Sequence, residues 1–468
     1  MEVGREDSIL ASFVSLGGGV ILSRIVAFVG TAYLARTLGT YAFGIVGFAT
    51  ALTAFLALGL RMGFEPIGAR EVARDREAAS RLAVGVGLLR LAIAFVGLAI
   101  LTSIALFLDR PPEVRHVIVL TGLLLIPWAL DPRWVYRGLA RNRWVGFSMV
   151  LAQVVYVAIL LVMVKSPEDV FWAPLALFVG ETIAMIFLAL PLLWSGSGGV
   201  DWNRAWGVLR SSGLLVTSGL LGALIRTTDI VLIAMLLGEA QVGIFSAAYR
   251  VCYLILAIAV SLHSAYQPRV ARVSLTDLSE IRQTTFQAFE AAASLAIPFV
   301  VGGWILATPI LTHLFGPAFA GGRDAFRLLL LAMGMFFLHG IYFHILVAFD
   351  RTRPELVIRG SAAGLNLMLN LFLIPRFGIE GAAVATVLAE LVILIWRGWV
   401  CRRLGVTISS RFLWKPFAAA TGMAVVILWM EPRFFWLLTF AAGGLSYIVF
   451  LLLLDGWPRD LRPRFLQR

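Results

Sequence analysis

The sequence is poor in charged residues, in lysine and in cysteine. Only 14% of its 468 residues are charged and 60% are hydrophobic, whereas a soluble protein has about a quarter of its residues charged. Lysine occurs only at Lys165 and Lys415, so 37 of the 39 basic residues are arginines. The two cysteines, Cys252 and Cys401, lie in or beside apolar segments, which excludes a disulfide framework and a cysteine metal centre. These shortages exclude a soluble globular protein and predict an integral membrane protein.

The sequence also lacks any stretch between its apolar segments that is long enough to form a soluble domain. A membrane-spanning helix needs about 20 apolar residues, and such segments follow one another along the chain. Long amphipathic strands are absent, which favours a bundle of α-helices over a barrel. The expected fold class is therefore an all-α integral membrane protein with about 14 transmembrane helices. These spans are expected near residues 8–37, 41–62, 80–108, 114–138, 144–164, 170–194, 209–237, 241–266, 284–314, 323–349, 355–374, 380–402, 412–430 and 433–454.

Basic residues are unevenly distributed between the two sides of the predicted bundle. With the N-terminus inside, 27 of them fall on the inner side, 8 fall on the outer side, and four arginines lie within spans. Cytoplasmic loops are enriched in Arg and Lys, so both termini are predicted to be cytoplasmic. The net charge of +12 thus indicates membrane topology and attraction to anionic headgroups, and we expect no nucleic-acid partner. The expected location is the plasma membrane of a bacterium or an archaeon.

An internal repeat links the two halves of the chain. Leu38-Gly39 with Gly44 matches Leu237-Gly238 with Gly243 at an offset of 199, and the segment 138–143 (GLARNR) matches 348–353 (AFDRTR) at an offset of 210. Glu181 in span six roughly matches Glu390 in span twelve. We therefore predict two six-helix lobes related by a parallel repeat, and two extra C-terminal helices with a cytoplasmic tail. The expected divisions are 1–200, 201–408 and 409–468. Carriers built from such repeats bind their substrate between the halves.

Four arginines near mid-depth are the main candidates for a binding site. Arg24, Arg90, Arg226 and Arg250 lie in spans 1, 3, 7 and 8. On insertion scales each costs about 2.5–3.5 kcal/mol at the centre of a span, so we expect them to line water, to pair with an acid or to bind an anion. Local pairing is a real alternative for Arg226, because Asp229 follows it by three residues. Together the four predict a cationic cavity for an anionic cargo, since arginine binds phosphate through two parallel hydrogen bonds.

A second set of polar residues offers oxygen ligands for a small cation. Asn366 and Asn370 are four residues apart on span 11, span 12 carries Thr386 and, one turn earlier, the carbonyl of Ala382, and span 7 carries Asp229. Hard oxygen ligands with one carboxylate suit Na⁺, by the logic that applies to other hard ions. The alternative is that the two asparagines join helices by hydrogen bonds, and spacing alone favours this alternative.

Several other ionisable residues within the predicted spans have weaker support for a functional role. Glu181, Glu290 and Glu390 are single acids in apolar spans; proton coupling is one hypothesis for them, and a hydrogen-bonded structural role is the favoured one. Three histidines have no metal-binding spacing, namely His313, His339 and His344. We expect no cofactor, and at most Na⁺ or H⁺ as a coupling ion.

The chain resembles the exporters of the multidrug/oligosaccharidyl-lipid/polysaccharide (MOP) superfamily, and more closely the polysaccharide flippases of the Wzx type. The resemblance lies in the segment 35–44 (ARTLGTYAFG), in Leu58-Gly59-Leu60 and in the arginine-rich segment 138–143. It implies two six-helix lobes with alternating access, and a cargo of undecaprenyl-pyrophosphate-linked sugars. Drug exporters of the superfamily often carry an acid in span 1, where this chain has Arg24.

Lipid II flippases of the MurJ type are similar in having fourteen spans and a cationic cavity. Some of them also have a sodium site, formed by an Asp on span 7, an amide/acid pair on span 11 and a Thr on span 12. Asp229, Asn366, Asn370 and Thr386 fall at matching places, although Asn370 stands where the resemblance leads us to expect an acid.

The predicted function is a transporter rather than an enzyme: a flippase that moves an undecaprenyl-pyrophosphate-linked oligosaccharide from the inner to the outer leaflet, for polysaccharide or cell-wall synthesis. Expected partners are the lipid-linked glycan, membrane lipid, a glycan polymerase and chain-length proteins. A multidrug/cation antiporter of the same superfamily is the first alternative, and Arg24 disfavours it. A membrane-embedded glycan polymerase or ligase is the second, and the absence of a long outer loop disfavours it.

Overall fold

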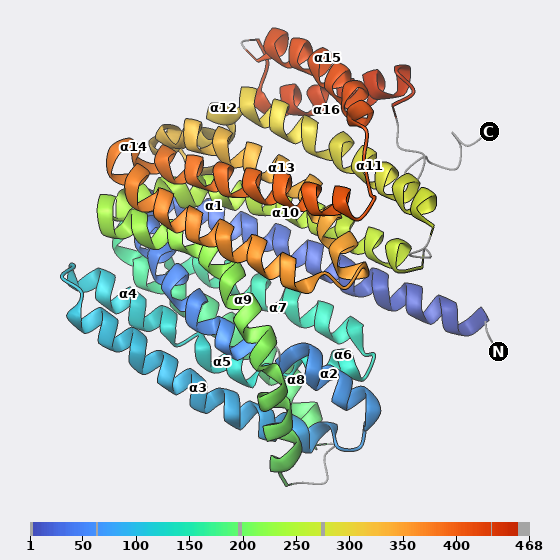
Figure 1. The fold of residues 1–468 in the computed structure, drawn as a ribbon. Coiled ribbons are helices and arrows are strands. Elements are labelled where there is room, and N and C mark those ends of the chain that lie inside the picture. The colour runs from blue at the N-terminus through green and yellow to red at the C-terminus, as the bar shows by residue number, and fades with distance from the viewer. Residues whose placement is uncertain (1–2, 62–63, 195–198, 273–276, 432, 457–468) are drawn as a thin grey trace. The chain divides into compact units, whose positions relative to one another are not determined.

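The computed structural model describes residues 3–61, 64–194, 199–272, 277–431 and 433–456, and the side chains of these residues except 3–17, 61, 212–226 and 271–272. The described residues form α-helices and three short 3₁₀-helices, η1 to η3 (Figure 1). In chain order they are α1 (Val3–Arg61), α2 (Phe64–Arg74), α3 (Ala79–Phe107), α4 (Pro112–Gly122), α5 (Leu125–Leu130), α6 (Arg133–Gly138), α7 (Asn142–Met163), η1 (Pro167–Phe171), α8 (Trp172–Trp194), α9 (Trp202–Leu237), α10 (Glu239–Arg272), α11 (Leu278–Ile305), α12 (Ala307–Phe315), η2 (Pro317–Gly322), α13 (Arg323–Ala348), α14 (Thr352–Arg403), η3 (Ser410–Leu413), α15 (Trp414–Met430) and α16 (Trp436–Leu453).

These helices confirm the prediction of an all-α membrane protein. Within the described part of the chain, 11 helical segments are long and apolar enough to cross a membrane. Two of them, in α1 and α14, contain a turn with non-helical backbone at Gly39 and at Gly378, so each supplies two of the predicted spans. A further apolar helix, Thr227–Leu237, is the described end of the span predicted at 209–237. The fourteen predicted segments therefore each correspond to a helix, to one limb of a helical hairpin or to a run of consecutive helices.

The repeat predicted from the sequence is also a repeat of backbone conformation. Gly39 has φ 71° and ψ −178°, and its counterpart Gly238 has φ 88° and ψ 174°. Positive φ is adopted readily by glycine and rarely by other residues. The glycines of the two Leu-Gly pairs are therefore required by the turns that reverse the chain between the first two helices of each half.

The second pair of matching segments forms two turns of the same type. Ala140 and Asp350 have φ 59° and 53°, and Arg141 and Arg351, which follow them, both have φ −95° and ψ 49°. The Arg141 amide donates to the Tyr136 carbonyl, and the Arg351 amide donates to the Leu346 carbonyl, each over 2.8 Å. This hydrogen bond closes the end of one helix before the next begins. The two turns, 210 residues apart, thus share one backbone conformation.

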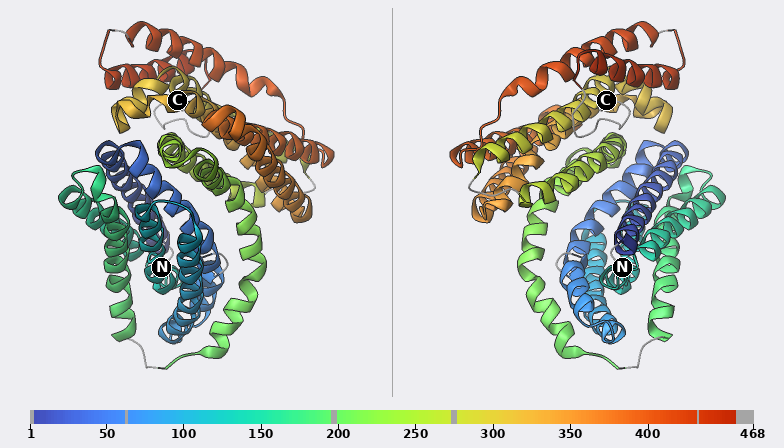
Figure 2. Two further views of the ribbon diagram at one scale, coloured as in Figure 1. Left: turned by 90° about the vertical axis from the view of Figure 1, so that its left-hand side faces the viewer. Right: turned by 90° about the vertical axis from the view of Figure 1, so that its right-hand side faces the viewer.

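The helices group into two compact units, Met1–Gly243 and Ile244–Arg468, which are described separately. In the first unit α9, which the repeat assigns to the second half, packs against α1, α2 and α3 (Figure 2). Packing therefore divides the chain after Gly243, whereas the repeat places the start of the second half near residue 201.

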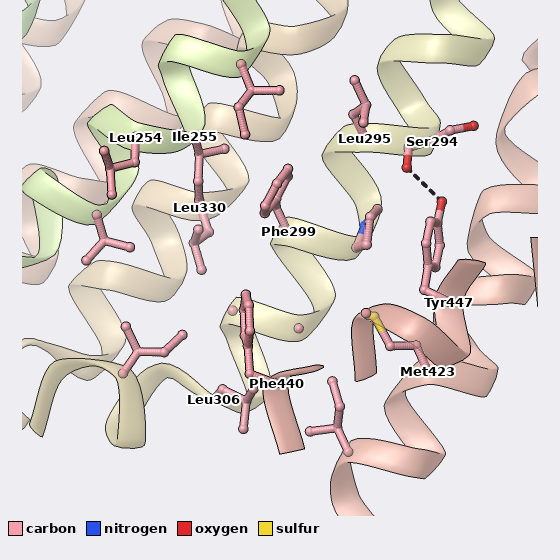
Figure 3. Close-up of a pocket in the computed structure, with 18 of the residues that line it drawn as sticks. Leu254, Ile255, Ser294, Leu295, Phe299, Leu306, Leu330, Met423, Phe440 and Tyr447 are labelled. Carbon is pink, nitrogen blue, oxygen red and sulfur yellow. Dashed lines mark hydrogen bonds between the residues drawn. The ribbon is translucent and has the colours of Figure 1, made fainter. Parts of the chain in front are cut away.

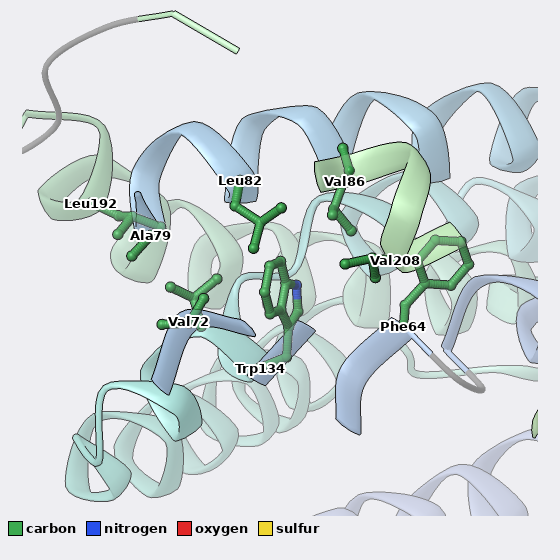
Figure 4. Close-up of a cluster of buried hydrophobic side chains, with 10 residues drawn as sticks. Phe64, Val72, Ala79, Leu82, Val86, Trp134, Leu192 and Val208 are labelled. Atoms are coloured by element: carbon green, nitrogen blue, oxygen red, sulfur yellow. The ribbon is translucent and has the colours of Figure 1, made fainter. Parts of the chain in front are cut away.

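A buried apolar cluster in the first unit holds α2, α3, α6, α8 and α9 together. Trp134 on α6 lies at its centre, among Val72, Leu82 and Val208 (Figure 4). A Cβ atom at Gly68 would lie 2.7 Å from the Trp134 ring, so α2 packs directly onto the indole. The sequence did not predict α2, because this short amphipathic helix lies between two spans and buries only Phe64, Gly68 and Val72. Outside the spans, Arg204 donates to Asp75 over 2.5 Å and lowers the pKa of that carboxyl.

The second unit is built on α11, α13 and the two limbs of α14. The limbs meet at Gly378, which has φ 62°, and a Cβ atom at Gly381 would lie 2.4 Å from the Leu373 carbonyl oxygen. α13 packs along α14, and α15 and α16 pair with each other and contact α11 (Figure 1). This arrangement creates an apolar groove beside α15 and α16 and a buried group of charges between α13 and α14.

Candidate functional site

Arg24 lies on the side of α1 that its packing leaves open. Gly19 and Gly30 contact α7, because a Cβ atom at either would lie within 2.8 Å of Gly146 or Val157. These two glycines are about 20° apart around the helix, and Arg24 is about 120–140° away from them. Its side chain is exposed, and among the described residues it has no hydrogen bond or ion pair. An exposed guanidinium within a span is therefore available to an anion or to water.

Arg250 on α10 has a similar environment. Its side chain is half-buried, and it too has no hydrogen bond or ion pair among the described residues. Next to it an aromatic ladder runs along α10, with Phe245 5.7 Å from Tyr249 and Tyr249 5.0 Å from Tyr253 between ring centroids. Tyr253 is 39% exposed, so an aromatic face lies beside this cation.

Arg90 differs from these two. It is 1% exposed, donates from Nη2 to the Trp128 carbonyl over 2.6 Å, and its guanidinium carbon lies 6.0 Å from the centre of the Phe64 ring. These contacts join α2, α3 and α5. That Arg90 binds an anion in a cavity stays a prediction, and in this conformation the group is enclosed by the first unit. The side chain of Arg226 lies outside the described residues.

Two other enclosed arginines, Arg133 and Arg397, pair with acidic side chains. Arg133 lies 3.3 Å from Asp131 and 3.1 Å from Glu181, and Arg397 donates to Glu355. Glu181 thus has a cationic partner, which agrees with the structural role favoured for it. Arg24 and Arg250 stand apart from this pattern within the described part of the chain.

The four candidate cation ligands lie on three helical segments. Asn370 Nδ2 donates to Asn366 Oδ1 over 3.1 Å on the first limb of α14, and Thr386 donates to the Ala382 carbonyl over 3.1 Å on the second limb. Asp229 is fully buried on α9 in the other unit. The amide oxygen of Asn366 and the Ala382 carbonyl thus accept hydrogen bonds from within α14, an arrangement that suits helix packing. The sodium site stays a prediction.

The second unit contains an apolar groove beside its two C-terminal helices, where the resemblance leads us to expect a site for a lipid tail. The groove has a volume of about 460 Å³ and is lined by α10, α11, α13, α15 and α16. Leu254, Phe299 and Leu330 face it from one side, and Met423 and Phe440 from the other (Figure 3). Figure 3 also labels two polar residues, and these bond to each other: the Tyr447 hydroxyl donates a hydrogen bond to the Ser294 carbonyl over 2.9 Å. Such a surface binds hydrocarbon and offers nothing to a polar headgroup.

Sequence comparison places more than half of the chain in one family. The family described as Polysaccharide biosynthesis protein matches residues 9–274, and the family described as MatE matches residues 215–372. The chain is 22% identical over 248 residues to "Putative O-antigen transporter" of Escherichia coli (strain K12), covering 51% of this chain and 59% of that protein. It is 28% identical over 167 residues to "Probable flippase AglR" of Haloferax volcanii, covering 34% of each. The matches thus span from about a third to about three fifths of these relatives.

Solved structures show the same fold over nearly the whole chain. The lipid II flippase MurJ in an inward closed conformation superposes with a TM-score of 0.77 at 15% identity, covering 95% of this chain and 99% of that one. An inward-facing multidrug resistance MATE transporter of the MOP superfamily gives a TM-score of 0.64 at 17% identity, covering 82% of this chain and 95% of that one. The fold is that of membrane transporters rather than of enzymes. With the match over residues 9–274, the chain belongs to the Polysaccharide biosynthesis protein family.

Proposed function

We propose that the protein is a flippase that moves a lipid-pyrophosphate-linked oligosaccharide from the inner to the outer leaflet. The observation that carries this proposal is Arg24, an exposed guanidinium within a span that has no hydrogen bond or ion pair among the described residues. A charge in this position is costly unless a ligand or water compensates it. The names of the relatives, an O-antigen transporter and a flippase, support a glycan cargo.

In this proposal Arg24 binds the pyrophosphate, which the planar guanidinium contacts through paired hydrogen bonds, and Arg250 is a second candidate ligand. Tyr253, exposed near Arg250, offers an aromatic face to a sugar ring. The carrier lipid is a polyprenol, undecaprenol in a bacterium. The inside of the membrane is negative, so moving two negative charges outward is favourable by about 2.3 kcal/mol per charge per 100 mV. The membrane potential therefore contributes to the direction of transport.

The test is reconstitution of the full chain in liposomes that contain a fluorescent polyprenyl-pyrophosphate oligosaccharide. A reductant that does not cross the membrane bleaches only the outer leaflet, so flipping appears as loss of the protected fraction. We expect faster loss with protein than with empty liposomes, and no faster loss for a labelled phosphatidylcholine. Equal rates for the glycan lipid in the two kinds of liposome would contradict the proposal. Export of a cationic dye by the same liposomes would support a drug antiporter instead.

The groove beside α15 and α16 is proposed to hold part of the prenyl tail while the headgroup moves. Gly444 lies in its wall, and a Cβ atom there meets nothing within 4 Å. Gly444→Trp should therefore fold normally and fill the groove. We expect the rate of flipping to fall about tenfold or more, with unchanged protein levels in the membrane.

Gly207→Trp is the matched control for the groove. Gly207 is exposed on α9, and a Cβ atom there also meets nothing within 4 Å, but it lies outside the groove. This variant should flip at the wild-type rate. If Gly444→Trp also flips at that rate, the groove does not carry the tail.

A further inference from the structure

Five ionisable side chains meet inside the second unit and form what we call the buried charge cluster: His339 on α13, Glu355 and Arg359 on the first limb of α14, and Glu390 and Arg397 on its second limb. The exposed fractions of His339, Glu355, Glu390 and Arg397 are 3%, 6%, 9% and 2%. Buried charges in a membrane protein are costly and often functional. The proposed transport of a pyrophosphate uses none of these five residues.

Arg397 is the centre of the cluster. Its Nε donates to Glu355 Oε2 over 2.9 Å, and its Nη2 donates to Glu355 Oε1. Its Nη1 donates to the His339 carbonyl over 3.1 Å and lies 2.7 Å from His339 Nδ1. Arg359 Nε also donates to Glu355 over 2.5 Å. One guanidinium therefore joins both limbs of α14 to α13.

These contacts fix the protonation of His339. A guanidinium has only hydrogen-bond donors, so Nδ1 of His339 must accept from Arg397 and carries no proton. The ring proton is then on Nε2, which donates to Glu390 Oε2. In this state His339 is neutral and Glu390 is a carboxylate, so the charges of two arginines and two glutamates balance. One titratable ring lies between a fixed cation and an acid.

The other titratable or aromatic side chains near His339 make contacts of their own. From α10, His263 hydrogen bonds to the Phe337 carbonyl over 2.9 Å, and its ring lies against Gly340, where a Cβ atom would be 2.0 Å from the ring. His344, on α13 itself, has its ring centroid 6.1 Å from that of His263. α11 meets this part of α13 through Phe289, whose ring lies 4.8 Å from Tyr342. Within the described residues, the charged groups that contact His339 are Glu390 and Arg397.

The first half of the chain offers a comparison. Its matching acid, Glu181, accepts from Arg133 over 3.1 Å, and Arg133 also donates to Ser148. An arginine stays charged at all physiological pH values, whereas a histidine titrates near neutral pH. The repeat thus holds one acid with a permanent cation and the other with a group that can gain a proton.

We propose that the His339–Glu390 pair is a proton-binding site, and that uptake of a proton releases the Arg397 guanidinium from the His339 ring. The proton adds to the lone pair of Nδ1, which gives an imidazolium that still donates from Nε2 to the Glu390 carboxylate. Nδ1–H and the Arg397 Nη1–H are then both donors, so their hydrogen bond cannot persist. Arg397 keeps its two bonds to Glu355 and its bond to the His339 carbonyl, and only its contact with the His339 ring is lost.

The position of the cluster gives the proton a route from one side. Glu355 lies three residues after the start of α14, and Arg359 is 34% exposed in its side chain. Glu390 lies thirteen residues before Arg403 at the end of α14, about 20 Å along the helix. The cluster therefore runs from the end of α14 that the charge distribution places inside the cell toward mid-depth. Proton binding from the cytoplasmic side would thus remove one of the contacts between α13 and the second limb of α14.

The first experiment measures proton binding on the full chain in lipid nanodiscs, without any cargo. Infrared difference spectra between about pH 5 and about pH 8 should show one histidine more taking up a proton in the wild type than in His339→Gln. His339→Gln should lose this signal, because the amide can still donate to Glu390 but does not titrate. Glu181→Gln, the matched acid of the first half, should keep it. Glu390→Gln is the second variant, in which the titration should move to lower pH because the imidazolium loses its anion.

The proposal is overturned if His339→Gln keeps the full histidine signal of the wild type. Coupling of this proton to transport rests on the proposed function and is measured separately, in the flipping liposomes with an imposed pH gradient. The wild-type rate should change by up to about tenfold per pH unit, and the His339→Gln rate should not respond. A pH response that persists in His339→Gln overturns the coupling. Absence of flipping by the wild type contradicts the proposed function and leaves the titration result as it stands.

Discussion

Arg24→Ala is expected to abolish flipping of the lipid-linked glycan while the protein remains in the membrane at its normal level. The side chain is exposed and has no hydrogen bond or ion pair among the described residues, so its removal breaks no contact that holds α1 in place. A charge-assisted bidentate contact to phosphate contributes about 1.5–3 kcal/mol, which corresponds to a loss of roughly ten- to a hundredfold in binding. The liposome assay and complementation of a deletion strain measure the loss.

Two further variants make the Arg24 prediction specific. Arg24→Lys keeps the charge but loses the planar pair of donors, so we expect an intermediate rate. Arg353→Ala removes an exposed arginine next to the turn before α14 and should leave flipping unchanged. If Arg24→Ala flips at the wild-type rate, Arg24 does not bind the cargo, and the main support for an anionic substrate is lost.

The helices and the repeat could be predicted because their signals are local. A run of about 20 apolar residues needs a helix wherever it lies in the bilayer, so the fourteen segments match the structure. Gly39 and Gly238 mark the first pair of turns because positive φ favours glycine. The turns at Ala140 and Asp350 have the same conformation without glycine. The match between these two segments is indicated instead by the arginines that follow.

The buried charge cluster could not be predicted, because its contacts join residues that are distant in the sequence. Arg397 lies near the end of a predicted span, yet it is 2% exposed and pairs with Glu355, 42 residues earlier. His339 and Glu390 are 51 residues apart in the sequence. Only the fold of α14 on itself and its packing on α13 bring these groups together. The same limit applies to Arg90, whose carbonyl partner Trp128 lies 38 residues away.

The two Leu-Gly turns of the repeat also contact each other, which the sequence alone did not indicate. A Cβ atom at Gly44 would lie 1.7 Å from the Glu239 carbonyl oxygen, and one at Gly243 would lie 2.0 Å from the Thr40 carbonyl oxygen. The contact is reciprocal, because Gly44 and Thr40 become Gly243 and Glu239 when 199 is added. The distribution of basic residues in the sequence predicts that these turns lie on the outer side of the membrane.

Arg110, after the end of α3, strengthens this contact from the side. It donates from Nη2 to the Ala234 carbonyl over 2.7 Å, and its Nη1 lies 3.5 Å from the Glu239 carboxylate. The carbonyls at the end of a helix carry partial negative charge, which a cation stabilises. The turn between α9 and α10 is thus held by a guanidinium as well as by backbone contact with α1. A transporter with alternating access must separate such a closed contact once in each cycle and form it again.

Gly44→Ala and Gly243→Ala are therefore expected to prevent this contact and to stop flipping. The obstacle at each position is a backbone carbonyl, which cannot move aside as a side chain can, so the turns must separate. Overpacking in a well-packed interior costs about 1–3 kcal/mol, enough to shift the population of the closed arrangement by about five- to a hundredfold.

A cysteine at Ala42, which is 4% exposed, reports the shift, since both native cysteines are buried. Ala42→Cys should react slowly with a membrane-impermeant maleimide in the wild-type background and at least about fivefold faster with either alanine. Gly18→Ala, where a Cβ atom meets nothing within 4 Å, should change neither labelling nor flipping. Slow labelling with active flipping in Gly44→Ala would mean that the turns tolerate a methyl group and that their contact is not part of the transport cycle.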